Sequence, residues 1–271
     1  MDRNSSPVEL TLQTPQTWPV PLLAFLDEHC DLFLDWSRGP QRFSAASYDR
    51  AIYGLRDLLQ PYLLVAWHCT RLTDDEVSAI VSHCMQPPNP DGLRRRIDAL
   101  VRAGIISDEV AAQLKGRNQA EETYRRDRIW WCFYPPKGSG EGGIRSLLET
   151  WGGEALYNSH DDDVVVGPLL RSIGRPSVIE ADIPIAMLGE SASPVFSVVA
   201  HYLVAMGHTP RDRLEFEDRI VEALPAKNIR RIVQYPDSAF VALTDCDGWS
   251  RPPGSERDQP HISDIAGDIC S

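Results

Sequence analysis

A short, nearly continuous apolar run at residues 62–67 constrains the fold of this chain more than any other feature. A run of that length, rich in aromatic and branched residues, predicts a buried strand. Just beyond it, Thr73 and Glu76 have the spacing of a capping box, which predicts that a helix begins there. We therefore expect a buried strand that is followed at once by a helix.

Helices and strands are expected in an irregular order along the rest of the chain. Apolar residues at three- and four-residue spacing predict helices at 22–36, 47–59, 91–102, 107–114 and 144–151. Runs rich in β-favouring residues predict strands at 128–134, 177–183, 217–223, 229–235 and 239–243. The segment 194–206 fits a strand or a buried helix, and 137–143 is expected to be a flexible Gly-rich loop. Because strands and helices do not alternate strictly, the pattern favours an α+β fold over a doubly wound sheet.

Composition agrees with a packed, cytoplasmic protein. Hydrophobic residues make up 42% of the chain and charged residues 24%, which supplies a core. The sequence lacks the eighteen or more consecutive apolar residues of a membrane span, and its start lacks the pattern of a secretory signal. The formal net charge of −12 argues against broad nonspecific binding to nucleic acid. None of the six cysteines forms a Cys-x-x-Cys pair, and a reducing compartment would keep them as thiols.

Two polar residues lie near the end of the predicted first strand. His68 and Thr70 are two residues apart, so their side chains point to the same side of a strand. An imidazole offers a donor and an acceptor, and the threonine adds a hydroxyl, so the pair could grip a ribose. The alternative is a histidine that satisfies a backbone group near the start of the helix.

Aromatic residues dominate the run at 128–134. Such rings could stack on a positively charged pyridinium, because a cation is attracted to an aromatic face. Strand alternation places Trp130 on one face and Trp131 on the other, and Tyr134 follows further along, so the pattern does not choose among them. Core packing is the alternative for the tryptophan pair.

Carboxylates lie before a Leu-Pro-Ala turn late in the chain. Glu215 and Glu217 share one strand face by alternation, and the turn at 224–229 follows them. A fixed carboxylate can stabilise the positive charge that develops on a ribose when a glycosidic bond breaks. A solvated acidic patch is the alternative. The segments 150–157 and 167–174 contain glycines that could let the backbone approach cofactor phosphates, and Arg71 and Arg171 are the natural cations for these groups.

Together these stretches resemble the ADP-ribosyltransferase superfamily, in the branch with a His-Tyr-Glu signature. The strand ending in His68 and Thr70 is similar to the first NAD-binding strand, and 128–133 resembles the strand that supplies a stacking aromatic. Glu217 resembles the catalytic glutamate, and Glu215 the first member of a Glu-x-Glu pair. The sequence departs from the family's tyrosine, and the resemblance covers less than a third of the chain.

The resemblance implies an α+β fold with a mixed or antiparallel split sheet around an NAD cleft. The expected organisation is an N-terminal helical segment at 1–60 that is poorly ordered up to about residue 17, a catalytic domain at 61–244 with a helical insertion at about 91–126, and a loose tail at 245–271. NAD would be the substrate, with its ribose held by His68. The acceptor would be a protein, a nucleic acid, a small molecule or, in NAD hydrolysis, water. A toxin or defence role, with a cognate inhibitor or immunity protein, is also implied.

Two other functions follow from other features. A metal-dependent hydrolase is the first, because the adjacent His-Cys pairs at 68–69 and 83–84 and the acidic run at 160–163 contain ligand types. The spacing of the His-Cys pairs is not a standard zinc spacing. The second is a noncatalytic interaction protein with a transferase-like fold, which the missing tyrosine favours.

Overall fold

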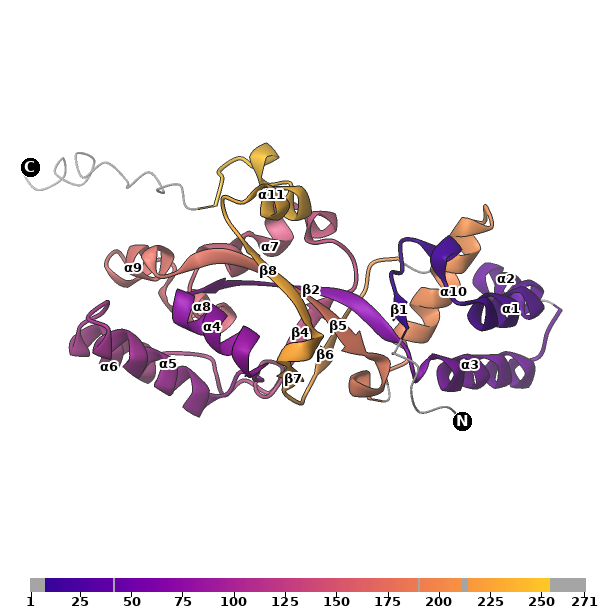
Figure 1. The fold of residues 1–271 in the computed structure, drawn as a ribbon, viewed down its shortest axis with the longest axis horizontal. Coiled ribbons are helices and arrows are strands. Elements are labelled where there is room, and N and C mark those ends of the chain that lie inside the picture. The colour runs from indigo at the N-terminus through magenta and orange to yellow at the C-terminus, as the bar shows by residue number, and fades with distance from the viewer. Residues whose placement is uncertain (1–7, 41, 190, 211–213, 254–271) are drawn as a thin grey trace, which may run out of the picture.

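A six-stranded sheet forms the centre of the α+β fold in the computed structural model, which describes residues 8–40, 42–189, 191–210 and 214–253 (Figure 1). The strand order is β6-β4-β2-β5-β8, and β1 pairs with β2 in parallel while the other pairings are antiparallel. The sheet strands are β1 (Glu9–Leu10), β2 (Leu63–Leu72), β4 (Ile129–Cys132), β5 (Arg175–Pro184), β6 (Glu217–Ile220) and β8 (Ile229–Gln234). A second, two-stranded sheet pairs β3 (Cys84–Met85) with β7 (Leu224–Pro225).

Both faces of strand β2 are covered by core side chains. Leu64 and Ala66 pack into the largest core cluster, whereas Val65 and Trp67 pack on the opposite face against α7 (Gly140–Glu149). This double burial explains the continuous apolar run in the sequence. The strand extends beyond the predicted 62–67, since it pairs with β5 through ten consecutive residues.

Four helices gather at one end of the sheet (Figure 1). They are α1 (Val20–Glu28), α2 (Cys30–Arg38), α3 (Ala45–Leu59) and α10 (Ser193–Ala205), and they share the largest core cluster with the sheet. The single helix expected at 22–36 is thus two helices, which meet at His29. Helix α10 settles the ambiguous segment at 194–206 as a buried helix.

The predicted helical insertion lies at the other end of the sheet, with its own core cluster (Figure 1). The predicted range holds α5 (Pro90–Arg102) and α6 (Asp108–Gly116), and α8 (Glu154–His160) and α9 (Val166–Ser172) add to the same cluster. Helix α4 (Asp74–Ser82) lies before the insertion and packs against the largest core cluster. The capping box is confirmed, since Thr73 Oγ1 accepts from the Glu76 N–H and Glu76 Oε2 accepts from the Thr73 N–H. The Glu76 carboxylate also pairs with Arg96 at 2.6 Å and accepts from the Trp151 indole at 3.1 Å, which ties α4 to α5 and to the turn after α7.

Several local predictions were wrong. Residues 137–143, expected as a flexible loop, form a 3-10 turn (Pro136–Ser139) and the first turn of α7. The strand expected at 239–243 is helix α11 (Ser238–Thr244), because Phe240 packs against the sheet face that carries Val65.

Both ends of the chain are more ordered than expected wherever the structure describes them. Segment 8–17 is anchored by β1 and by the buried side chains of Leu10 and Leu12, and near the C-terminus a 3-10 turn buries Cys246. The remainder of the expected loose segments, 1–7 and 254–271, lies outside the described residues. Across the described ranges, no helix has the length and apolar character that a bilayer crossing requires.

Gly174, just before β5, gives a direct test of this packing. Its φ is +65°, and a Cβ there would lie 2.3 Å from the Leu72 carbonyl oxygen, which is backbone and cannot move aside. Gly174→Ala should therefore lower the free energy of unfolding by at least about 3 kcal/mol, as a backbone clash adds to the left-handed cost. The measurement is urea unfolding.

Gly104→Ala is the matched control, because Gly104 has a similar φ of +69° with open space around it. It should cost only about 1–2 kcal/mol. Equal losses for the two variants would contradict the close approach of Gly174 to β2.

Candidate functional site

The three strands that carry the predicted motifs are neighbours in the sheet. Strand β4 lies between β2 and β6. It pairs with β6 over four residues but with β2 only at Trp67 and Cys132, so residues 129–131 of β4 form no ladder pair with β2. The sheet is therefore nearly split at this position.

The His68 side chain bridges the gap between the two strands. Its Nδ1 lies 2.8 Å from the carbonyl oxygen of Trp130. A carbonyl oxygen only accepts hydrogen bonds, so Nδ1 carries the proton in this contact. Burial lowers the pKa of His68, and the charge of Arg96 lowers it further, against the opposing effect of the carbonyl contact. The imidazole is consequently neutral at pH 7.

The register places His68 and Glu217 on opposite faces of the sheet. Trp67, Cys132 and Glu217 form one row across β2, β4 and β6, with their side chains on the face covered by α7. His68 is the next residue along β2, and its ring packs against Trp131 on the other face, 5.7 Å between centroids. The structure thus does not bring the predicted histidine and glutamate together.

The Glu217 carboxylate instead meets side chains from β4 and the turn after it. Its Oε1 accepts from the Tyr134 hydroxyl at 3.0 Å and from the Cys132 thiol at 3.7 Å. The Tyr134 hydroxyl also lies 2.9 Å from Ser139 Oγ. Glu217 itself is exposed, so the contacts orient a carboxylate that faces solvent.

Both donors to Glu217 hold their protons at neutral pH. Burial raises the pKa of Cys132 to about 12, and the adjacent Glu217 charge adds to the effect. Burial also raises the pKa of Tyr134, with a smaller contribution from Glu217. The carboxylate therefore accepts from two groups that keep their protons, the Tyr134 hydroxyl and the weaker Cys132 donor.

A hollow of about 420 Å³ lies in front of this carboxylate. Its lining comes from Tyr134, Gly138, Glu215, Phe216 and Glu217. Glu215 precedes β6 and is also exposed, so the predicted Glu-x-Glu pair does border one space. At Gly138 a Cβ would lie 2.9 Å from Tyr134 Cδ2, which explains the glycine beneath this ring.

The aromatic residues predicted to stack on nicotinamide differ in how deeply they are buried. Trp131 is fully buried in the core and cannot stack on a ligand. Trp130 is 39% exposed, and Tyr134 lines the hollow beside Glu217. Thr70 is half-buried and lies two residues beyond His68 on the same face of β2.

The two predicted phosphate-binding arginines have partners inside the protein. The buried Arg71 donates from Nε to the Ile173 carbonyl at 2.7 Å, and burial lowers its pKa to about 10 despite the nearby Glu149. Arg171 pairs with Asp161 at 2.9 Å. These contacts account for both residues without a ligand.

Sequence reasoning missed Gly138, Ser139 and the role of Cys132. The available signal was the Pro-Pro-Lys-Gly-Ser-Gly turn directly after Tyr134, which we expected to be a flexible loop. Its 3-10 conformation brings Ser139 back to the Tyr134 hydroxyl.

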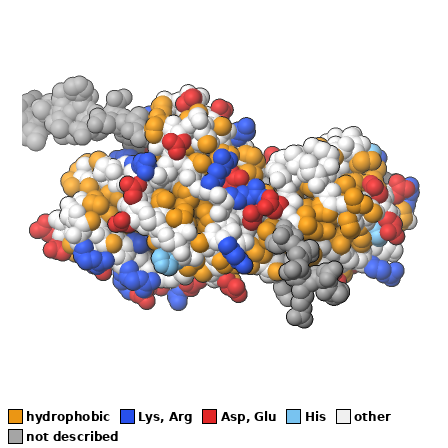
Figure 2. Space-filling model, viewed as in Figure 1, with side chains coloured by type: hydrophobic (Ala, Val, Ile, Leu, Met, Phe, Trp, Pro, Cys, Tyr) orange, Lys and Arg blue, Asp and Glu red, His pale blue; other side chains and the backbone are white. Residues whose placement is uncertain are grey.

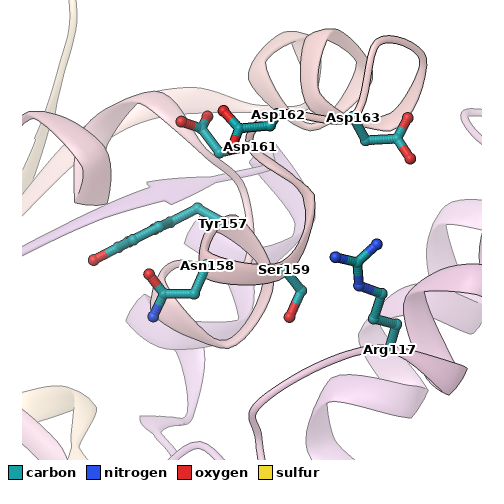
Figure 3. A pocket seen from close by; sticks show the side chains of 7 residues that line it. All are labelled: Arg117, Tyr157, Asn158, Ser159, Asp161, Asp162 and Asp163. Carbon is teal, nitrogen blue, oxygen red and sulfur yellow. The ribbon is translucent and has the colours of Figure 1, made fainter.

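A second, smaller hollow of about 300 Å³ lies at the acidic run after α8 (Figure 3). Asp163 Oδ1 accepts the N–H groups of Val165 and Val166 at the start of α9, and Asp161 binds Arg171. These acids are thus engaged in capping and ion pairing. Throughout the described part of the chain, no group of three or more His, Cys, Asp or Glu side chains is arranged to hold a metal ion.

No protein-family model, no curated protein and no solved structure matches this chain.

The neutral His68 makes a prediction about pH. Its folded-state pKa lies below the ordinary value of 6.5, so the unfolded chain binds the extra proton first. The free energy of unfolding should hence be constant above that value and fall as the pH drops from 6.5 towards the folded pKa. Denaturant unfolding at a series of pH values measures it.

His68→Asn is the comparison, because an amide can donate to the Trp130 carbonyl but does not titrate. The variant should lose part of the acid sensitivity. His201, whose pKa burial also lowers, contributes equally to both proteins. Identical pH profiles would show that the folded protein does not hold His68 in its neutral form.

Proposed function

We propose that this chain is an NAD-dependent ADP-ribosyltransferase whose reaction centre is the hollow at Glu217 and Tyr134. One observation carries the proposal: the stretches that resemble this superfamily come from distant parts of the sequence yet form the neighbouring strands β2, β4 and β6. The near split between β2 and β4 also agrees with the split sheet that the resemblance implies.

Glu217 supplies the chemistry that the reaction needs. When the bond from ribose C1′ to the nicotinamide nitrogen breaks, its electron pair leaves with nicotinamide and positive charge develops on the ribose. A carboxylate held by Tyr134 and Cys132 is oriented in advance to stabilise that charge. The acceptor then forms the new bond to C1′ and loses a proton. Glu215, at the same hollow, adds negative potential.

The remaining residues take roles that differ partly from those of the family. Tyr134 is the aromatic wall for nicotinamide, because Trp131 is buried and Tyr134 lines the hollow. His68 is a positioning residue that fixes β4 through the Trp130 carbonyl, rather than a ribose contact.

The acceptor is a protein, a nucleic acid or water, and the exposed Glu217 leaves room for a large one. A role as a toxin or defence effector, with a cognate inhibitor or immunity protein, fits such a transferase in the cytoplasm.

The proposal is tested by measuring the nicotinamide released from NAD with chromatography. The assay is run once with water as the acceptor and once with added cell extract, which supplies macromolecular acceptors. Glu217→Gln keeps the shape of the side chain and removes its charge. It should reduce nicotinamide release by about 10²–10³-fold, the usual effect of losing one stabilising group at a reaction centre. Tyr134→Phe should reduce it less, by about tenfold, since one hydrogen bond to Glu217 is lost.

Glu222→Gln serves as the control, because Glu222 is an exposed acid beyond the end of β6. Its activity should equal that of the wild type. Undiminished turnover in a folded Glu217→Gln variant, or no nicotinamide release by the wild type under either condition, would reject the proposal.

A further inference from the structure

A second pair of side chains lies beside the Glu217 hollow on the same sheet face. Trp130 and Arg219 are cross-strand partners, each two residues from the Cys132 and Glu217 pair. Side chains two residues apart in a strand share a face at a spacing of about 6.6 Å. The Trp130–Arg219 pair is therefore the next position along the face from the carboxylate.

Hydrogen bonds to neighbouring groups hold both side chains of the pair in place. The Trp130 indole donates from Nε1 to the Tyr124 carbonyl at 3.0 Å, which fixes the plane of an exposed ring. Arg219 lies with Cζ 5.6 Å from the centre of that ring, and its Nη1 donates at 3.1 Å to Asp218, which is only 2% exposed. A buried carboxylate thus orients a guanidinium that is itself partly open to solvent.

We propose that Trp130 and Arg219 bind the adenylate half of the NAD donor, with the base on the indole and the phosphate on the guanidinium. This inference rests on the proposed function and deepens it. A flat, fixed aromatic surface suits a nucleobase, and a guanidinium suits a phosphate. The half-buried Arg128 lies just before β4 and has no ion pair within the described residues, so it adds a second cation.

Charge sets the direction of the bound dinucleotide. The hollow itself is acidic, with Glu215 and Glu217 in its lining, so it repels phosphates and favours the positively charged nicotinamide end. Arg219, two residues further along β6, provides the opposite potential. The donor therefore lies along β4 and β6 with nicotinamide at Glu217 and adenylate at Trp130.

Adenosine monophosphate is the probe, because it carries the adenylate half and cannot undergo the transfer reaction. Titration should quench the protein's tryptophan fluorescence in a saturable way, and Trp130→Leu should abolish this signal. Arg219→Gln, which can still donate to Asp218, should weaken binding about tenfold and should leave the affinity for adenosine, which has no phosphate, unchanged. Tyr53→Leu, a change of an exposed aromatic on α3, is the matched control and should bind like the wild type.

The outcomes separate this inference from the proposed function. Saturable quenching by adenosine monophosphate that Glu217→Gln retains and Trp130→Leu loses supports the adenylate site, whether or not the protein releases nicotinamide. No saturable binding, or binding that survives Trp130→Leu as judged by calorimetry, overturns it. Binding of a short single-stranded oligonucleotide without binding of the mononucleotide also overturns it and assigns the pair to an acceptor strand.

Discussion

The burial of β2 on both faces is the constraint on which the rest of the structure depends. A ten-residue ladder with β5 holds one edge of the strand, and core clusters cover Leu64 on one side and Trp67 on the other. With its backbone fixed in this way, β2 can lose nearly all of its pairing with β4. The near split of the sheet is thus stable because the opposite edge of β2 is fully paired.

Next to this near split, the candidate residues lie on two opposite faces of the sheet. On one face His68 spans the gap and packs on Trp131. On the other, Cys132, Tyr134 and Glu217 converge on an open hollow. The geometry therefore concentrates the chemistry on β4, β6 and the turn before α7, and it gives the histidine a supporting role between the strands.

Sequence reasoning located the central strand, the capping box at Thr73 and the helices of the insertion, because each has a strong local signal. It failed at 239–243, where β-branched and aromatic residues suggested a strand but tertiary packing of Phe240 selected a helix. The site was only partly predictable. Side-chain alternation within β4 was correct, yet the register between strands, which puts Glu217 opposite Cys132, is a long-range property without a local signature.

The same limit explains the aromatic residues. Trp130 and Trp131 are adjacent residues of the same type, so the sequence does not tell them apart. Only the position of the core distinguishes the exposed ring of Trp130 from the buried ring of Trp131. Gly138 had a clear physical reason, its approach to the Tyr134 ring, but that reason exists only once the turn has folded back.

A crystal structure of the Glu217→Gln variant with NAD bound tests the central claim most directly. We predict that the nicotinamide ribose lies in the hollow between Tyr134 and residue 217, on the face of the sheet covered by α7. NAD bound on the opposite face, against His68 and Trp131, would contradict the account and would return the ribose contact to the histidine.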